Sequence, residues 1–274
     1  MPEGHSIRRD ATQAKAALGG QVLRASSPQG RFAESAALLD GLVLRATDPH
    51  GKHLFLDFAP TPRSKPVRWL HVHRGLYGVW MLQRHDGVEP LPPRGAVRLR
   101  LSSETHTADL RGPTACDLVT PPEVQAIHDR LGADPLRPES DPERAWERIH
   151  RSRVGIGALL MQQEVVAGVG NVYRAEVLFR ARVDPYRQGR DLTRAEWDGI
   201  WADLVELMRA GVRSGRIVTT LPQDRERTSG RARRVDAHYV YRRAGEPCRV
   251  CGTPVRTAVL VARNLFWCPV CQAH

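Results

Sequence analysis

The sequence predicts a multidomain α+β protein in which an N-terminal β-sandwich is followed by a helical domain and by a zinc-bound β-hairpin. Three observations lead to this fold class. The chain has 274 residues, which exceeds the usual size of a single domain. Short apolar or alternating runs fill residues 21–118, whereas apolar residues recur every three or four positions from residue 121 onward. Four of the five cysteines stand in two close pairs near the C-terminus.

The N-terminal part begins with an expected helix over residues 5–18, because its apolar residues fall on one stripe and two glycines follow it. The runs that follow are short and are separated by turn residues, which is typical of strands. We expect strands at residues 22–25, 42–46, 53–58, 68–72, 78–82 and 97–101. No helical pattern lies between them, so the strands predict a sandwich rather than a parallel sheet.

The pattern becomes helical after residue 120, and the expected helices cover residues 123–131, 142–152, 155–165, 171–181 and 194–210. Residues 214–235 are rich in arginine, serine, threonine and glycine, and we interpret them as a mobile basic loop. These changes of pattern predict three domains, at residues 1–120, 121–235 and 236–274.

The cysteine spacing is the strongest single signal. Cys248 and Cys251 form one CxxC pair, and Cys268 and Cys271 form a second pair after sixteen intervening residues. Two such pairs can surround one tetrahedral zinc ion, and a full set of four cysteines leaves no open position for catalysis, so we expect one structural zinc.

Between the two pairs, residues 255–261 are expected to form a strand, Arg263-Asn264 a turn and residues 265–267 the returning strand. Metal binding can supply on the order of 10 kcal/mol, which a core of this size could not provide. The remaining cysteine, Cys116, is expected to be a buried thiol without a role.

Charge points to a polyanionic partner. The net charge is +11, and the stretch from Arg209 to the C-terminus holds thirteen arginines against four acidic residues. No apolar run approaches the roughly 20 residues of a membrane span, and the N-terminus lacks the apolar core of a signal peptide. We therefore expect a cytoplasmic, nucleoid-associated protein that binds nucleic acid.

The chain starts with a potential nucleophile. Removal of Met1 would leave Pro2 as a terminal secondary amine, which is far less protonated at neutral pH than a lysine. Such an amine can form a Schiff base with electrophilic carbon, and Glu3 provides a neighbouring carboxyl group for proton transfer. Lysine is rare in this chain, so Lys52, at a turn that leads into a strand, is a further candidate.

Two other segments carry candidate binding residues. Residues 166–173 place glycines between two helical stretches, and Asn171 would open the second helix as its N-cap, where free N–H groups bind anions. In residues 71–78, Leu76 lies on a basic turn and could wedge into a base stack. Each signal alone also fits an ordinary helical hairpin or a core leucine.

Taken together, these segments resemble the formamidopyrimidine-DNA glycosylase and endonuclease VIII family over essentially the whole chain. The resemblance rests on Pro2-Glu3-Gly4, Gly51-Lys52, residues 166–173 with the following Glu176, and the four-cysteine module with Arg263. It implies a base-excision repair enzyme with a β-sandwich, a helix-two-turn-helix domain and a zinc-ribbon hairpin. Its implied partner is double-stranded DNA that contains damaged bases or abasic sites, bound by a monomer.

The resemblance also implies roles for single residues. Pro2 would attack the sugar C1′ atom, Glu3 would donate a proton, and Lys52 and Arg263 would assist the eliminations or hold the phosphates around the lesion. The residues implied to contact DNA are His73, Gly75, Leu76, Tyr77, Arg130, Asn171 and Tyr241.

The branch of the family is a separate question. Residues 75–80 look like the endonuclease VIII version, since the purine-excising branch usually has methionine at the position of Leu76. This chain departs from the endonuclease VIII pattern at Gly75, where glutamine is expected. Oxidised pyrimidines are the favoured substrates. The alternatives are an oxidised-purine glycosylase of the same family and a non-catalytic, zinc-dependent DNA-binding protein.

Overall fold

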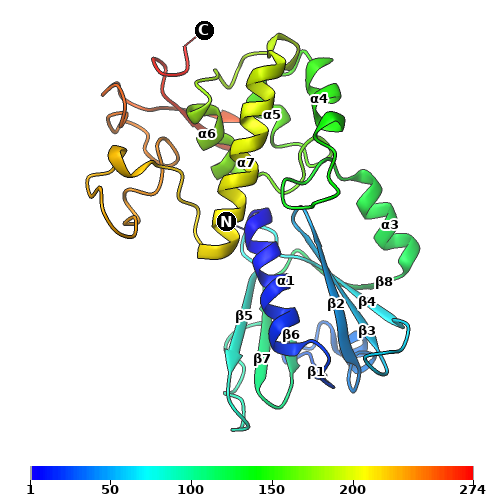
Figure 1. Ribbon diagram of the computed structural model, residues 1–274. Coiled ribbons are helices and arrows are strands. Elements are labelled where there is room, and N and C mark those ends of the chain that lie inside the picture. The colour runs from blue at the N-terminus through cyan, green and yellow to red at the C-terminus, as the bar shows by residue number, and fades with distance from the viewer. Residues whose placement is uncertain (1, 274) are drawn as a thin grey trace. The chain divides into compact units, whose positions relative to one another are not determined.

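The computed structural model describes residues 2–273 and divides the chain into two compact units, residues 1–130 and 131–274. Each unit is described by itself (Figure 1). Among the described residues, no helix has both the length and the apolar character that a membrane span requires. The boundary after Arg130 places the helix at residues 121–130 with the first unit, whereas the three-domain division of the sequence starts a new domain there. The further division at residue 235 stays a prediction.

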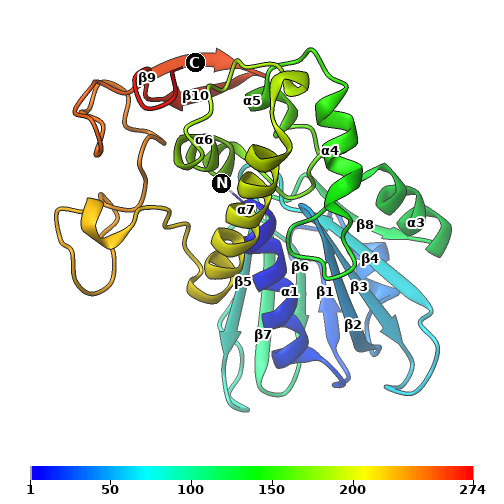
Figure 2. The same ribbon diagram turned by 45° about the horizontal axis from the view of Figure 1, so that its top comes forward.

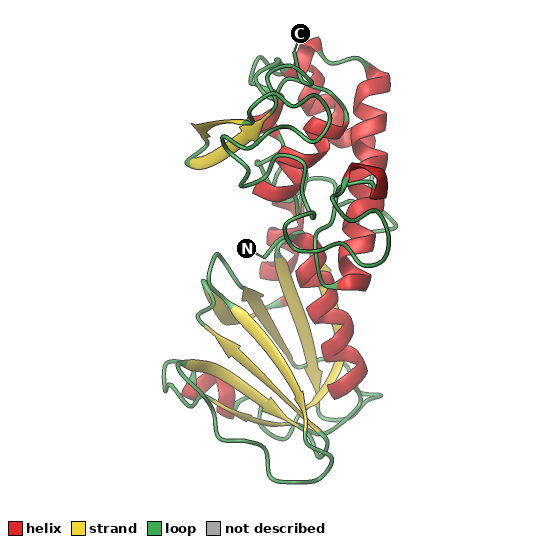
Figure 3. Ribbon diagram, turned by 90° about the vertical axis from the view of Figure 1, so that its left-hand side faces the viewer, coloured by secondary structure: helices red, strands yellow, loops and turns green. Residues whose placement is uncertain are grey.

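The first unit is a sandwich of two four-stranded antiparallel sheets (Figure 3). One sheet has the order β1-β6-β7-β5 and the other the order β2-β3-β4-β8. The strands are β1 Arg24–Ser26, β2 Val43–His50, β3 His53–Ala59, β4 Arg68–His73, β5 Val79–Arg84, β6 Val97–Ser102, β7 His106–Arg111 and β8 Ala115–Val119. Apolar side chains of both sheets form one buried core, so the predicted sandwich is confirmed.

Three helices accompany the sheets: α1 Gly4–Leu18, α2 Ala33–Ala37 and α3 Pro121–Arg130. Helix α1 contacts β2 of one sheet and β5 and β7 of the other, and it buries the apolar stripe that the sequence predicts. Helix α3 has no buried residue. The helix thus adds little to the core and connects the two units along the chain.

The sequence did not predict α2, β7 and β8. Helix α2 is only five residues long, which is too short for a periodic signal. Strand β7 has the sequence HTADLR and is polar for a strand that pairs on both sides, with β5 and β6. Its place in the sheet comes from pairing with distant strands rather than from its own alternation.

The second unit contains helices α4 Pro142–His150, α5 Ile156–Leu159, α6 Asn171–Arg180 and α7 Arg194–Ser214, the 3-10 turns η1 Gly189–Asp191 and η2 Pro222–Asp224, and the hairpin β9 Arg256–Leu260 with β10 Arg263–Trp267. Residues 171–179 of α6 are all buried, so α6 is the centre of this unit. One apolar cluster packs around it from α4, α5 and α7, and another from the segment that ends in the zinc module. The hairpin lies along α6 (Figure 2).

Helix α5 is much shorter than the helix predicted over residues 155–165, and that prediction is wrong. After Leu160 the chain turns, and the Ala167 N–H donates to the Ala133 carbonyl at 2.9 Å. The Gly132 N–H donates to the Gln163 carbonyl at 2.8 Å, and a Cβ on Gly132 would lie 2.3 Å from the Val165 carbonyl oxygen. Close pairing with residues 132–133 therefore replaces the last turns of the helix.

Candidate active site and zinc centre

The candidate nucleophile and acid lie at the start of α1. Glu3 is the N-cap residue, its carbonyl accepts from the Ser6 N–H at 2.9 Å, and its side chain is fully buried. Pro2 precedes it and is half-buried. A carboxylate at a helix N-terminus lies close to free backbone N–H groups, which stabilise negative charge. Met1, whose removal the sequence-based mechanism requires, lies outside the described residues.

The second and third turns of α1 hold two loops of the sandwich. The Arg8 guanidinium donates to the Pro49 carbonyl at 3.4 Å, just before the turn that contains Lys52. Asp10 accepts from Arg74 at 2.6 Å, and Arg74 also donates to the Gly78 carbonyl at 3.0 Å. Burial raises the pKa of Asp10 to about 6, while Arg74 acts in the opposite direction. The helix that carries Glu3 is thus tied to both loops that carry predicted site residues.

Lys52 lies in a two-residue hairpin turn between β2 and β3, which pair at His50 and His53. Gly51 has φ +56°, which a glycine adopts easily at the first position of such a turn. Lys52 itself is half-buried, and its charge contributes to lowering the pKa of His73, after burial as the main cause. The structure therefore brings two predicted site residues, Lys52 and His73, into the same neighbourhood.

The sheet beside Lys52 carries a group of imidazoles that the sequence analysis did not use. His53 Nδ1 lies 2.8 Å from His71 Nε2, and the ring of His73 is 4.8 Å from that of His53. Burial lowers the pKa of His53 to about 3 and that of His71 to about 4, with neighbouring imidazoles adding to the effect. These rings are neutral at pH 7 and form a packed surface under the lysine turn.

The loop after β4 presents two exposed side chains, Leu76 at 39% and Tyr77 at 82% exposure. Gly75 has φ +65°, and a Cβ at this position would lie 1.8 Å from Thr114 Oγ1. A glutamine, which the family pattern leads one to expect here, would be strained and would displace Thr114. The absence of a side chain at residue 75 is therefore part of the local backbone conformation.

In the second unit, the N-terminus of α6 is joined to the hairpin. The Asn171 side chain donates to the Asn264 carbonyl at 2.9 Å, and Arg174 donates to the Asn171 side chain and, at 3.3 Å, to the Leu260 carbonyl. The N-cap of α6 is Gly170, so the prediction that Asn171 caps this helix is wrong. As the first helical residue, Asn171 uses its amide to fix the hairpin instead.

The hairpin turn differs from the expected one. Val261 and Ala262 form the turn, both at φ +53°, and Arg263 is the first residue of β10 rather than part of the turn. The Arg263 side chain is exposed at the end of the hairpin, next to the residue that Asn171 holds. The structure thus places Arg263 and Asn171 together, as the motifs led us to expect.

Glu176 organises the segment that carries Tyr241. Its carboxylate is fully buried and accepts from the N–H groups of Tyr239, Val240 and Tyr241 at 2.7, 2.9 and 2.8 Å, and from the Thr219 hydroxyl. The sequence analysis noted Glu176 only as part of a motif. A charged residue inside the apolar run of α6 was the signal for this role, as it was for the fully buried Arg174.

The other predicted DNA contacts differ in their surroundings. Tyr241 is only 8% exposed, and its ring packs edge-on against Phe266 with centroids 5.5 Å apart. Arg130, the last residue of α3, is exposed.

The four paired cysteines converge on one point. Their Sγ atoms all lie within 4.8 Å of one another, with Cys248 and Cys271 at 3.8 Å and Cys251 and Cys268 at 3.4 Å. A tetrahedral zinc with Zn–S bonds of about 2.3 Å requires S–S separations of about 3.8 Å, so the site fits zinc. Hydrogen bonds from Thr253 lower the pKa of Cys251 to about 6, which favours the thiolate that a metal binds.

Comparisons with known proteins decide the family. Residues 131–223 match the H2TH domain of formamidopyrimidine-DNA glycosylase, and residues 245–273 match the zinc finger found in FPG and IleRS. A protein named Endonuclease 8 1 from Mycobacterium tuberculosis is 48% identical over 284 aligned positions, covering 99% of this chain and 100% of that protein. The chain belongs to the formamidopyrimidine-DNA glycosylase and endonuclease 8 family. This is a family of base-excision DNA repair glycosylases, and the predicted resemblance is confirmed.

Other relatives carry both family names. Endonuclease 8 from Escherichia coli is 30% identical over 99% of this chain and 100% of its own length. Among solved structures, the formamidopyrimidine-DNA glycosylase of Thermus thermophilus matches with a TM-score of 0.77 at 28% identity, covering 100% of this chain and 99% of its own. A Lactococcus lactis Fpg complex with DNA and an inhibitor matches with a TM-score of 0.79 at 19% identity over 100% of both chains and confirms the Fpg-like fold.

Proposed function

We propose that this glycosylase is bifunctional: it removes oxidised bases, pyrimidines preferentially, and then nicks the strand at the resulting abasic site. The observation that carries the proposal is the N-terminal pair. Pro2 directly precedes the buried N-cap Glu3, on a helix that Arg8 and Asp10 tie to the two loops carrying Lys52 and Leu76. A DNA-binding protein without chemistry would have no use for this arrangement.

The chemistry follows from a terminal amine. The Pro2 nitrogen attacks C1′ of the damaged nucleotide, the C1′–N bond to the base breaks, and Glu3 supplies the proton for the opening sugar. The resulting iminium ion acidifies the C2′ proton, whose loss expels the 3′-phosphate in a β-elimination. A second, δ-elimination breaks the C5′–O bond and expels the 5′-phosphate. Water then hydrolyses the remaining imine and regenerates the amine.

We assign the cationic groups to phosphate. Lys52 in the hairpin turn and Arg263 at the end of the zinc hairpin would hold the phosphates around the lesion or assist the eliminations. His73, Arg130, Asn171 and Tyr241 would add backbone contacts, although the burial of Tyr241 leaves chiefly its edge for this purpose. One chain would act on double-stranded DNA as a monomer.

The exposed loop supports extrusion of the nucleotide. Leu76 and Tyr77 extend from a loop that Arg74 holds to α1, and an apolar side chain there can occupy the space left by a flipped base. Flipping costs a few kcal/mol and costs less for a damaged base that stacks poorly. The names of the relatives at 48% and 30% identity, Endonuclease 8 1 and Endonuclease 8, support the pyrimidine preference. Removal of oxidised purines is the second candidate, since other relatives are named formamidopyrimidine-DNA glycosylase.

Zinc would have a structural role. Bound by all four cysteines, it would hold the ends of the β9–β10 hairpin, and thereby Arg263, in position, because the hairpin has a small core of its own.

The test is covalent trapping. Incubation with an abasic-site duplex and borohydride should reduce the imine to a stable protein–DNA adduct at Pro2. Pro2→Gly and a variant that retains Met1 should lose base excision while they still bind the duplex, because only the nucleophile changes. Absence of any adduct from correctly processed protein, or full activity of Pro2→Gly, would refute the mechanism and favour a binding protein. Excision from a panel of single-lesion duplexes would then rank pyrimidine and purine substrates.

A further inference from the structure

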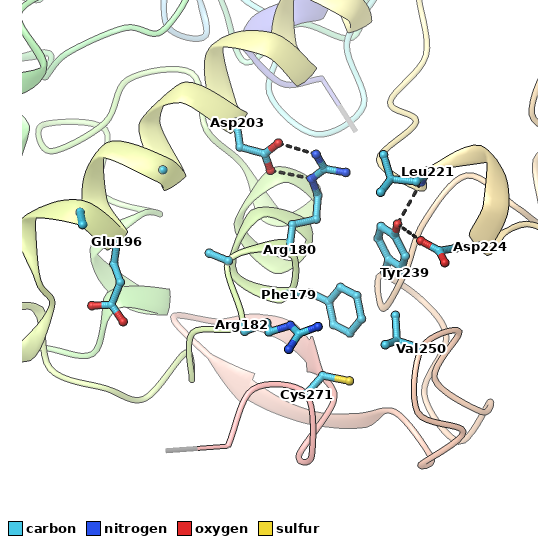
Figure 4. A pocket seen from close by; sticks show the side chains of 13 residues that line it. Phe179, Arg180, Arg182, Glu196, Asp203, Leu221, Asp224, Tyr239, Val250 and Cys271 are labelled. Atoms are coloured by element: carbon cyan, nitrogen blue, oxygen red, sulfur yellow. Dashed lines mark hydrogen bonds and ion pairs between the residues drawn. The ribbon is translucent and has the colours of Figure 1, made fainter.

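The second unit contains a cavity that none of the residues proposed for catalysis or DNA contact lines. It has a volume of about 540 Å³ and lies between the end of α6, the first half of α7, the turn η2 and the zinc module (Figure 4). Sites for small molecules commonly have volumes of roughly 300–1,000 Å³ and combine apolar walls with a few polar groups. The cavity is therefore large enough for a ligand of that class.

One wall is aromatic and apolar. The rings of Phe179 and Tyr239 stack with centroids 4.8 Å apart and an interplanar angle of 27°. Leu221 and Val250 line the same side and remain 44% and 52% exposed, although both are large apolar residues. A planar ring could pack on this wall and cover the two exposed side chains.

Helix α7 leaves the opposite wall open. Gly199 lies in the interior of this 21-residue helix, where glycine is less favourable than alanine. A Cβ at Gly199 would meet no atom within 4 Å, so packing does not require glycine there. Ala195, one turn earlier, also lines the cavity. The helix thus gives up stability at a position whose clear effect is to keep the cavity open.

The end of α6 shows the opposite exception. Arg182 has φ +56°, in the left-handed region where glycine is favoured, while the Val183 N–H donates to the Leu178 carbonyl at 2.9 Å to close the helix. Its side chain lines the cavity and points toward the Phe179 side (Figure 4). No hydrogen bond or ion pair engages the Arg182 guanidinium within residues 2–273. A cation has been placed where a glycine would be less strained.

The remaining polar group is an acceptor. Asp224 Oδ2 accepts from the Tyr239 hydroxyl at 2.6 Å, and Oδ1 has no donor within the described part of the chain. The other charges on the wall are neutralised, since Arg180 pairs with Asp203 and Glu196 with Arg187. The cavity therefore offers one cation, one open carboxylate oxygen and an aromatic surface.

We propose that this cavity binds a planar heteroaromatic anion of mononucleotide size, with its ring on the Phe179 and Tyr239 wall, an N–H group at Asp224 and its anionic group at Arg182. Two departures from local backbone preference, at Gly199 and Arg182, meet at one cavity, and such departures concentrate at functional sites. The inference is independent of the function proposed above.

Titration calorimetry of the full-length, zinc-loaded protein with adenosine 5′-monophosphate tests the proposal. Adenosine supplies the ring without the anion, and ribose 5-phosphate supplies the anion without the ring, so adenosine 5′-monophosphate should bind at least tenfold more tightly than either. Gly199→Phe, which fills the cavity, should weaken its binding at least tenfold. Ala202→Phe, on an exposed position of the same helix, should leave the binding unchanged.

Arg182→Gly provides a second arm that does not depend on filling the cavity. It should raise the Tm, because glycine fits this backbone conformation, and at the same time lower the affinity for adenosine 5′-monophosphate to that for adenosine. Arg209→Gln, an exposed arginine of α7 outside the cavity, should change neither quantity. Equal affinity of Gly199→Phe and the unaltered protein, or ribose 5-phosphate binding as tightly as the nucleotide, would overturn the proposal, since phosphate would then bind to the basic surface elsewhere.

Discussion

Replacement of Glu176 by glutamine tests how the segment before the zinc module is held. The carboxylate accepts three backbone N–H groups, from Tyr239, Val240 and Tyr241, at 2.7 to 2.9 Å in a fully buried site. Glutamine has nearly the same size but offers one acceptor oxygen, and its NH₂ group must face at least one of these donors. One buried N–H group left without a partner costs about 1–3 kcal/mol, and loss of the negative charge weakens the other hydrogen bonds by about 0.5–1 kcal/mol each.

Glu176→Gln should therefore lower the free energy of unfolding of the second unit by about 2–5 kcal/mol, a large part of the 5–15 kcal/mol that is usual for a folded domain. Urea unfolding followed by tryptophan fluorescence gives this difference, and a chromophoric chelator reports how fast zinc leaves the neighbouring module. Glu206→Gln, at an exposed position on α7, is the matched control and should stay within about 0.5 kcal/mol of the unaltered protein. A loss below about 1 kcal/mol for Glu176→Gln would show that the cradle does not hold this segment and would refute the reasoning.

Three further predictions concern the zinc module, the exposed loop and the imidazole group. Cys268→Ala should abolish zinc binding and, with it, DNA binding and nicking, as measured by metal analysis and gel shift; full zinc content in the purified variant would contradict this. Gly75→Gln should lower stability by about 1–2 kcal/mol in urea unfolding through backbone strain at φ +65° and contact with Thr114, and an unchanged midpoint would argue against the loop conformation described here. The pKa values of His53 and His71 are lowered to about 3 and 4, below the value of about 6.5 in an unfolded chain, so their contribution to stability is complete above pH 6.5 and is lost as the pH falls from 6.5 toward 4. Each should cost about 2 kcal/mol at pH 5, measured by urea unfolding at pH 7.5 and 5, and the double substitution by glutamine should flatten this dependence.

Much of the candidate site could be predicted because its signals are short in sequence. The two CxxC pairs, the Pro2-Glu3 start and the Gly51-Lys52 turn each occupy a few neighbouring residues, and chemistry limits what such groups can do. The confirmed family and fold class rest on several such segments occurring in one order. The assigned roles of the individual residues remain predictions that the trapping and binding experiments address.

Errors arose where distant contacts decide local structure. The helix predicted to Val165 ends after Leu160 because residues 132–133 pair with the chain there. Asn171 leaves the N-cap position to Gly170 because its amide bonds to a carbonyl 93 positions later in the chain. No window of neighbouring residues contains either partner, so periodicity and capping rules could not register the competition.

The sequence by itself determined the order of a β-rich part, a helical part and a four-cysteine module, because the period of apolar residues and the cysteine spacing depend on near neighbours. Only the tertiary structure decided that Arg74 joins the exposed loop to α1, that Glu176 gathers three backbone donors and that Gly199 and Arg182 face one cavity. These features join residues far apart in the chain, and their free energy comes from burial and hydrogen bonds that form only when the chain has folded.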